Sequence, residues 1–325
     1  MSRVHDALRK AAQQDKSELP RRTPRGELPP PPADYPGGDD EGVPVSSALA
    51  ATSSVAVDVE GDVDDLERII QNATVVPYNP AKGALIVNPT NPREAPAEEF
   101  RSLRTRLNHM QTVQPLHTLL ITSASPAEGK SFTAMNLAVT QSQLADKRIL
   151  LADFDFRRPS VDKTFQIDTS PGLTDYLLGK ASLAEIFRRI EGTSLYVLTA
   201  GEPVQNPLEL LNLKECKALI NGLRNHFDWV ILDSPPLLFA ADGNLLATMC
   251  DGTILVVRIG TTTFDSVSRA LQSLCENNVL GVVVNGARRG ELYSKYTYYH
   301  NYYYTPDEIE AGEDTAESEP VTIGS

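Results

Sequence analysis

Residues 124–132 have the composition of a phosphate-binding loop. Against the pattern G-x-x-x-x-G-K-[ST], Ala124 occupies the first glycine position, and the loop continues through Ser125, Pro126, Ala127, Glu128, Gly129, Lys130, Ser131 and Phe132. Such a turn aims backbone N–H groups at phosphate oxygens, and the helix that follows presents its positive N-terminus. Lys130 would reach the β- and γ-phosphates of a nucleotide, and the Ser131 hydroxyl would ligate Mg²⁺. The alternative is an ordinary strand–turn–helix corner.

Two acidic elements follow further along the chain. Asp153 and Asp155 lie two residues apart in ADFDFRRP, so in an extended segment both carboxylates would face one side. Two neighbouring carboxylates repel each other unless a cation or a shared proton relieves them. Asp233 ends the apolar run DWVILD, as in the Walker B pattern. Solvent-exposed aspartates are the alternative for each element alone, but three such elements in this order predict a site for ATP and Mg²⁺.

The segments that would position these residues alternate between strands and helices. Continuous apolar runs predict buried strands at 118–122, 148–154, 194–199, 229–233, 253–258 and 280–285. Helical patterns lie at 131–145, 182–191, 207–226, 241–248 and 264–277. This alternation predicts an α/β fold, a three-layer P-loop domain with a mainly parallel sheet, over residues 83–290.

The flanking segments have a different composition. We expect a short amphipathic helix at 1–14 and a Pro-rich disordered arm at 15–82, in which DLERIIQN adds a short helix. Residues 305–325 form an acidic tail, expected to be disordered. Between the domain and that tail, residues 291–304 hold seven of the eleven tyrosines: Tyr293, Tyr296, Tyr298, Tyr299, Tyr302, Tyr303 and Tyr304.

Charge and composition limit the classes of function. The net charge of −13 argues against a nucleic-acid partner. No run approaches the roughly 20 apolar residues that span a bilayer. The three cysteines are far apart in sequence, which suits a reducing cytosol rather than a disulfide framework. We therefore expect a cytoplasmic protein that a partner recruits to the membrane.

Residues 80–304 resemble the bacterial tyrosine kinases of the capsule and exopolysaccharide type. The resemblance rests on the P-loop without a strict first glycine, on LLADFDFRRP and VILDSPP, and on SPGLTDYLLG, NPLELL and GVVVNG. It implies an ATP-dependent tyrosine autokinase that phosphorylates its own C-terminal tyrosine cluster between subunits and regulates polysaccharide synthesis or export. It also implies a homo-oligomer, for which a ring is one arrangement, and a membrane polysaccharide copolymerase as a separate activating chain.

The resemblance also assigns roles to single residues. Asp153 resembles the proposed base for the incoming tyrosine, and Asp155 and Asp233 resemble metal-linked carboxylates, although which aspartate is the base stays open. Arg157, in the D-x-D-x-R position, would stabilise the transferring phosphoryl group. Asn285 lies where related ATPases contact adenine.

One further family pattern concerns assembly. Glu98, Arg101 and Arg104 fit E-x-x-R-x-x-R, on one face of a helix that in such kinases docks on the neighbouring subunit. Without the resemblance, the same spacing would more often be a salt-bridged surface helix.

Two rival functions remain. A P-loop ATPase switch of the partition or septum-placement type would carry its signature lysine at position 125, which is a serine here. A non-catalytic adaptor would use the polyproline arm and the N-terminal helix, and the intact set of Lys130, Ser131 and the three aspartates argues against it.

Overall fold

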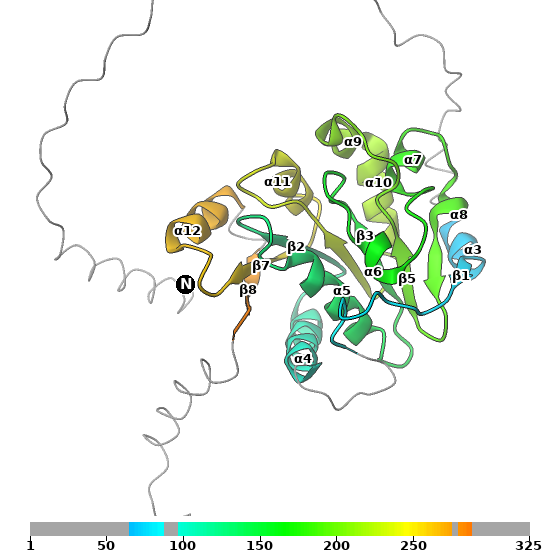
Figure 1. The fold of residues 1–325 in the computed structure, drawn as a ribbon. Helices are drawn as coiled ribbons and strands as arrows, with labels where there is room; N and C mark the ends of the chain where they lie inside the picture. Colours follow the sequence, from blue (N-terminus) through cyan, green and yellow to red (C-terminus); the bar gives the residue numbers. More distant parts are fainter. Residues whose placement is uncertain (1–64, 88–96, 275–278, 288–325) are drawn as a thin grey trace, which may run out of the picture. The chain divides into compact units, whose positions relative to one another are not determined.

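A computed structural model describes residues 65–87, 97–274 and 279–287 (Figure 1). Its eight strands form one sheet in the order β1-β4-β5-β3-β6-β2-β7-β8. Neighbouring strands are parallel except for β4 and β5. The strands are β1 (Thr74–Val76), β2 (Thr118–Ser123), β3 (Ile149–Asp153), β4 (Arg188–Ile190), β5 (Leu195–Leu198), β6 (Trp229–Asp233), β7 (Gly252–Arg258) and β8 (Val279–Asn285).

Helices cover both faces of this sheet, as the three-layer prediction requires. One face packs against α4 (Ala97–Val113), α5 (Lys130–Gln141) and α6 (Val161–Phe165). The other face packs against α3 (Leu66–Gln71), α7 (Leu173–Leu177), α8 (Leu183–Ile186), α9 (Pro207–Asn212), α10 (Lys214–Leu223), α11 (Ala241–Ala247) and α12 (Phe264–Ser273).

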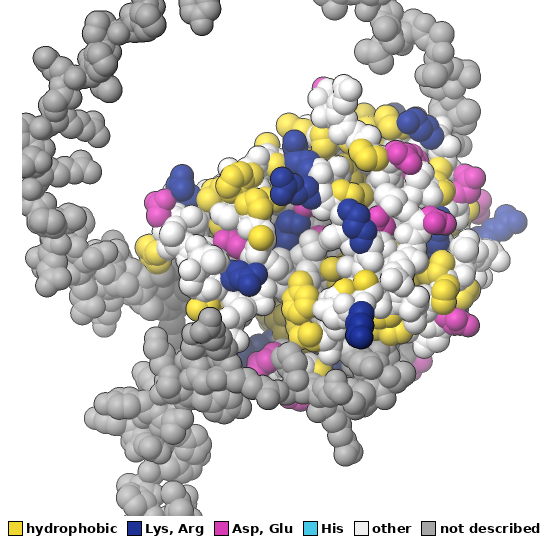
Figure 2. Space-filling model, in the orientation of Figure 1, with side chains coloured by type: hydrophobic (Ala, Val, Ile, Leu, Met, Phe, Trp, Pro, Cys, Tyr) yellow, Lys and Arg dark blue, Asp and Glu magenta, His cyan; other side chains and the backbone are white. Residues whose placement is uncertain are grey.

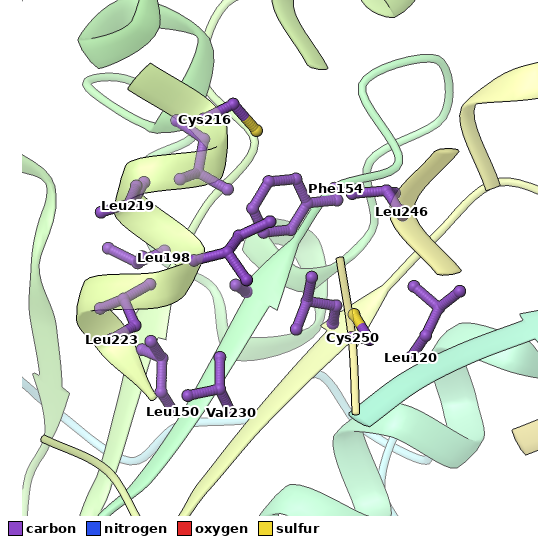
Figure 3. Close-up of a cluster of buried hydrophobic side chains, with 14 of the residues drawn as sticks. Leu120, Leu150, Phe154, Leu198, Cys216, Leu219, Leu223, Val230, Leu246 and Cys250 are labelled. Carbon is purple, nitrogen blue, oxygen red and sulfur yellow. The ribbon is translucent and has the colours of Figure 1, made fainter. Parts of the chain in front are cut away.

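Adjacent residues of the central strands explain why their sequences are apolar throughout. Leu150 of β3 belongs, with Leu198, Leu223 and Val230, to the core on one face of the sheet (Figure 3). The next residue, Leu151, belongs to the core on the opposite face. Successive side chains of a strand point to opposite faces, so a strand covered on both sides needs an apolar residue at every position.

All six predicted strands are confirmed, each within one residue at either end. The predicted helix at 182–191 is wrong in its second half, because α8 ends at Ile186 and β4 follows as a strand. The predicted helix at 207–226 is divided at Leu213, whose ψ of 144° is extended rather than helical.

The predicted start of the domain at residue 83 also needs correction. Helix α3 and strand β1 lie within the segment assigned to the arm, yet Leu66 and Ile70 are buried in the core and β1 pairs with β4. The short helix predicted in this segment is confirmed as α3, although its burial in the core was not expected. Strand β1 has only three residues, so its apolar pattern is too short to predict a strand. Residues 1–64, the tyrosine cluster and the acidic tail lie outside the described residues.

Candidate active site

The P-loop connects β2 to α5 through a backbone conformation that requires glycine at position 129. Ala127 and Gly129 both have positive φ, 63° and 100°. A Cβ at position 129 would lie 1.9 Å from Nδ2 of Asn285, so only glycine fits there. Ala124, in place of the usual glycine, is fully buried, and its carbonyl accepts a hydrogen bond from Leu238 N at 3.3 Å. Its methyl group lies in the hydrophobic core, which explains why alanine is tolerated at this position.

Lys130 begins α5 and is surrounded by acceptors. Its Nζ lies 2.7 Å from Oδ2 of Asp155, 3.1 Å from the Ser131 hydroxyl and 3.8 Å from Oδ1 of Asp233. Burial lowers the pKa of Lys130, but Asp233 and Asp155 outweigh burial and leave this pKa raised. The lysine therefore stays charged in a buried site, ready for an anion.

Asp153 and Asp155 make different contacts, in contrast to the expectation that both face one place. Strand β3 ends at Asp153, so the alternation of an extended chain does not continue to Asp155. Oδ2 of Asp153 accepts hydrogen bonds from Ser160 N and Val161 N at 3.0 and 3.1 Å, and Oδ1 accepts one from Asp155 N at 3.1 Å. Asp155 contacts Lys130 through Oδ2 and accepts from Arg158 N through Oδ1.

Buried charge dominates the environment of Asp153 and Asp233, which are register partners on the adjacent strands β3 and β6. Burial, together with the charge of Asp233, raises the pKa of Asp153 to about 8. Burial likewise raises the pKa of Asp233 to about 6, against the opposing effects of Lys130 and the Ser131 hydroxyl. Neither carboxylate oxygen of Asp233 has a hydrogen-bond partner of normal geometry. Such a buried carboxylate is suited to a cation.

The donor set fits Mg²⁺ only together with phosphate. Among the described residues, no three His, Cys, Asp or Glu side chains converge to hold a metal ion by themselves. Mg²⁺ is commonly held by one or two carboxylates, substrate phosphates and waters. Asp233 and the Ser131 hydroxyl, both beside Lys130, meet that requirement. Asp155 instead bonds Lys130 in this structure.

Arg157 points to a partner that the sequence did not indicate. Its guanidinium donates to both carboxylate oxygens of Asp242, with Nε–Oδ2 and Nη2–Oδ1 distances of 2.7 and 3.3 Å. Asp242 is buried in the first turn of α11. Several Lys and Arg side chains gather near α11 on the face shown in Figure 2, a distribution that suits an anionic ligand. Asp242 lies nine residues after Asp233 in a turn without a recognisable motif, so only the fold reveals it.

Two other predicted nucleotide contacts have roles within the protein. Asn285 donates from Nδ2 to the Glu128 carbonyl at 3.0 Å, and its Oδ1 accepts from Gly286 N at 2.8 Å. The ring of Phe132 packs edge-on against Phe100 of α4, with 6.2 Å between ring centroids. Asn285 therefore lies beside the P-loop, whereas the Phe132 ring anchors α5 to α4.

The E-x-x-R-x-x-R residues lie on α4 and have unequal environments. Arg101 forms an ion pair with the exposed Glu98. Arg104 donates from Nη1 to the Thr140 carbonyl of α5 at 2.8 Å. Glu98 is thus the exposed member of the motif, Arg101 is mostly buried beside it, and Arg104 joins two helices of the same chain. The seven tyrosines lie outside the described residues.

The chain is similar to characterised bacterial proteins. No family model matches it. It is 36% identical over 216 residues to the tyrosine-protein kinase YwqD of Bacillus subtilis, an alignment that covers 66% of this chain and 90% of YwqD. It is 32% identical over 198 residues to the tyrosine-protein kinase Etk of Escherichia coli, covering 60% of this chain but only 27% of Etk.

Solved structures show the same similarity. The kinase domain of Escherichia coli Etk matches with a TM-score of 0.58 at 32% identity, over 62% of this chain and 79% of that domain. The chimerical protein CapA2B2 matches with a TM-score of 0.60 at 27% identity, over 70% of this chain and 99% of the chimera. In the described part of the chain, no helix has both the length and the apolar character needed to cross a membrane.

Proposed function

Because this chain belongs to the family of bacterial tyrosine-protein kinases, we propose that it transfers the γ-phosphoryl group of ATP to the tyrosines of its own C-terminal cluster. The observation that carries the proposal is the position of Lys130. Its charged ammonium is buried at the start of α5 and contacts Asp155 and Asp233 from two neighbouring strand ends. An incoming triphosphate would exchange these contacts for its own oxygens.

Binding and positioning would supply most of the catalysis. Phosphoryl transfer requires mainly alignment of the groups and neutralisation of charge. Lys130 and the P-loop amides would bind the phosphates, and Ser131 and Asp233 would hold Mg²⁺, whose charge would further neutralise the phosphates when bound. The half-exposed Arg157 side chain, which pairs with Asp242 in this structure, would reorient toward the transferring group.

A general base must remove the phenol proton, because a tyrosine with a pKa near 10 is a poor nucleophile at neutral pH. Asp153 is suited to this role, since burial and Asp233 raise its pKa to about 8, closer to neutrality than an ordinary carboxyl. General bases act best when their pKa lies near the working pH. Asp153 is fully buried in this structure, so the acceptor tyrosine would have to enter the site to reach it.

Regulation would follow from the charge that the reaction adds. Each phosphotyrosine brings about −1.5 to −2 charges at neutral pH. Several of them beside the acidic tail would repel one another and any acidic surface, which would loosen a ring of subunits. The partner that we propose is a membrane polysaccharide copolymerase, present as a separate activating chain that recruits the cytoplasmic kinase to the inner face of the plasma membrane. The process under control would be capsule or exopolysaccharide synthesis or export.

The first experiment mixes the full chain with ATP and Mg²⁺ and maps phosphate by mass spectrometry, with and without the partner's cytoplasmic segment. Lys130→Met should reduce phosphate on Tyr293 to Tyr304 by about 100-fold or more, because the positive charge at the phosphates is lost. Lys147→Met is the matched control, since Lys147 pairs with Asp228 away from the P-loop. Nucleotide turnover with an unmodified tail would instead favour the ATPase switch.

A further inference from the structure

The P-loop is held by a second turn that belongs to none of the nucleotide motifs. This turn, defined here as residues 258–263, includes the last residue of β7 and leads into α12. The Thr262 hydroxyl lies 2.6 Å from Oε1 of Glu128 in the P-loop. From the same turn, Nη1 of Arg258 donates to the Ala127 carbonyl at 3.3 Å. We call Arg258, Thr262 and Asn285 the P-loop clamp.

Glu128 is the residue on which the clamp acts. It is only 3% exposed, and its second carboxylate oxygen accepts a hydrogen bond from Ser125 N at 3.0 Å, across the P-loop. The Glu128 carboxylate thus joins two parts of the P-loop through Ser125 N, and it also binds Thr262 outside the P-loop. A buried carboxylate without these donors would be costly, so both contacts constrain where the Glu128 side chain lies.

The hydrogen bonds also fix the direction of the Thr262 hydroxyl. Its oxygen accepts from Arg258 N at 2.8 Å. The remaining hydroxyl hydrogen is therefore directed to Oε1 of Glu128, and a hydrogen bond to a charged carboxylate is among the stronger kinds. Among the described residues, Thr262 is the one residue of the β7–α12 turn whose side chain forms a hydrogen bond with the Glu128 side chain.

The conformation held in this way is an uncommon one. Ala127 is a non-glycine residue with a φ of 63°, and Gly129 has a φ of 100°. Such backbone states persist only where the surrounding structure enforces them. The clamp contacts this segment at the carbonyls of Ala127 and Glu128 and at the Glu128 carboxylate. These are the residues directly before the helix N-terminus that would receive the phosphates.

We propose that Thr262 is a positioning residue for nucleotide binding, which acts through Glu128 to hold the P-loop in its phosphate-receiving conformation. This inference rests on the proposed nucleotide function and adds a determinant outside the P-loop. Without the Thr262 hydroxyl, the loop spends part of its time in other conformations. The apparent dissociation constant then rises in inverse proportion to the competent fraction.

The test measures the affinity of the full chain for a fluorescent ADP analogue with Mg²⁺. Thr262→Val keeps the side-chain shape but removes the hydroxyl, and it should weaken binding by about tenfold, the usual worth of a hydrogen bond to a charged group. Thr262→Ser should restore wild-type affinity. Thr261→Val is the matched control in the same turn, because the exposed Thr261 hydroxyl donates to the Arg258 carbonyl and not to the P-loop. Thr262→Ala replaces the valine variant if valine does not fold.

Two readouts separate positioning from a general loss of structure. The KM for ATP in autophosphorylation should rise by the same factor as the dissociation constant, while kcat changes less than about twofold. In a Glu128→Ala background, Thr262→Val should have no further effect on affinity. Equal affinity of the Thr262→Val and Thr261→Val variants would overturn the role of Thr262. So would additive effects of Thr262→Val and Glu128→Ala on affinity. A wild-type chain that does not bind the analogue would overturn the nucleotide site itself, and the positioning role with it.

Discussion

At the scale of single residues, the buried charges of the site lower the stability of the fold and favour the binding of a ligand. Asp153, Asp155 and Asp233 are all buried, and Lys130 is the cation that contacts two of them. Asp233 has the least support, since its oxygens accept no hydrogen bond of normal geometry. A carboxylate in this position lowers the stability of the ligand-free fold and gains a partner when a cation binds.

This cost predicts a pH-dependent stability difference for Asp233→Asn. The folded-state pKa of Asp233 is about 6, above its ordinary value of 3.8, so the folded protein binds this proton more tightly than the unfolded chain. The carboxyl is neutral below pH 4, and its stabilising protonation is lost as the pH rises through 6. Without metal or nucleotide, the variant should unfold at the same temperature as the wild type near pH 4. Above pH 6 it should be more stable by about 1–3 kcal/mol.

Thermal unfolding of both proteins in EDTA, from pH 4 to pH 8, measures this difference. The same variant should have lost Mg²⁺-dependent kinase activity. A stability difference that is constant across the pH range would show that Asp233 carries no unfavourable buried charge.

At the scale of elements, the sequence predicted the centre of the sheet better than its edge. The strands β2, β3 and β6 are covered on both faces, so their apolar runs are continuous and the chemical motifs follow at their ends. Strands β1 and β4 have three residues each, and β4 contains Arg188 and Arg189. Pairing with neighbouring strands, which a local pattern does not contain, determines the structure of such short polar segments.

In the candidate site, too, residues within local motifs were predicted from the sequence, and residues that distant contacts bring to the site were not. Lys130, Asp155 and Asp233 were predicted from motifs and do meet in the structure. Thr262 and Asp242 act on motif residues from 134 and 85 residues away in the chain, and neither has a local signature. Only the packing of β7 against β2 and of α11 near the strand ends brings them to the site.

Helix α4 gives a prediction at this scale, because the motif proposed for assembly also supports the fold. Arg104→Ala removes the hydrogen bond to the Thr140 carbonyl of α5 and should lower the free energy of unfolding by about 1–2 kcal/mol. Glu98→Ala, on the exposed side of α4, should change it by less than about 0.5 kcal/mol yet weaken self-association. Denaturant unfolding and light scattering measure the two effects. If Glu98→Ala leaves the oligomer unchanged, this face of α4 is not the interface.

At the scale of the whole molecule, the P-loop lies beside the end of β8, the last described strand before the tyrosine cluster in the sequence. Asn285, at the end of β8, contacts the Glu128 carbonyl, and Tyr293 follows eight residues later. A chain of that length reaches at most about 29 Å. The acceptor must approach Lys130 and the aspartates at the ends of β3 and β6. In the sheet, β3 and β6 lie on one side of β2, and β8 lies on the other side. Reach permits transfer within one chain or between two chains, so kinetics must decide.

Transfer between subunits predicts phosphorylation across a mixture of two defective chains. One partner carries Lys130→Met with all its tyrosines, and the other carries Tyr→Phe at the seven cluster positions with an intact site. Mass spectrometry should find phosphate on the tyrosines of the cluster, Tyr293 to Tyr304, which only the Lys130→Met chain retains. The rate should rise with the concentration of the intact-site chain, and Glu98→Ala in both chains should reduce it if assembly through α4 brings the tail to its neighbour. Two results together would show that the reaction occurs within one subunit. The mixture of defective chains would remain unphosphorylated, and the wild-type chain would phosphorylate itself at a rate that does not change on dilution.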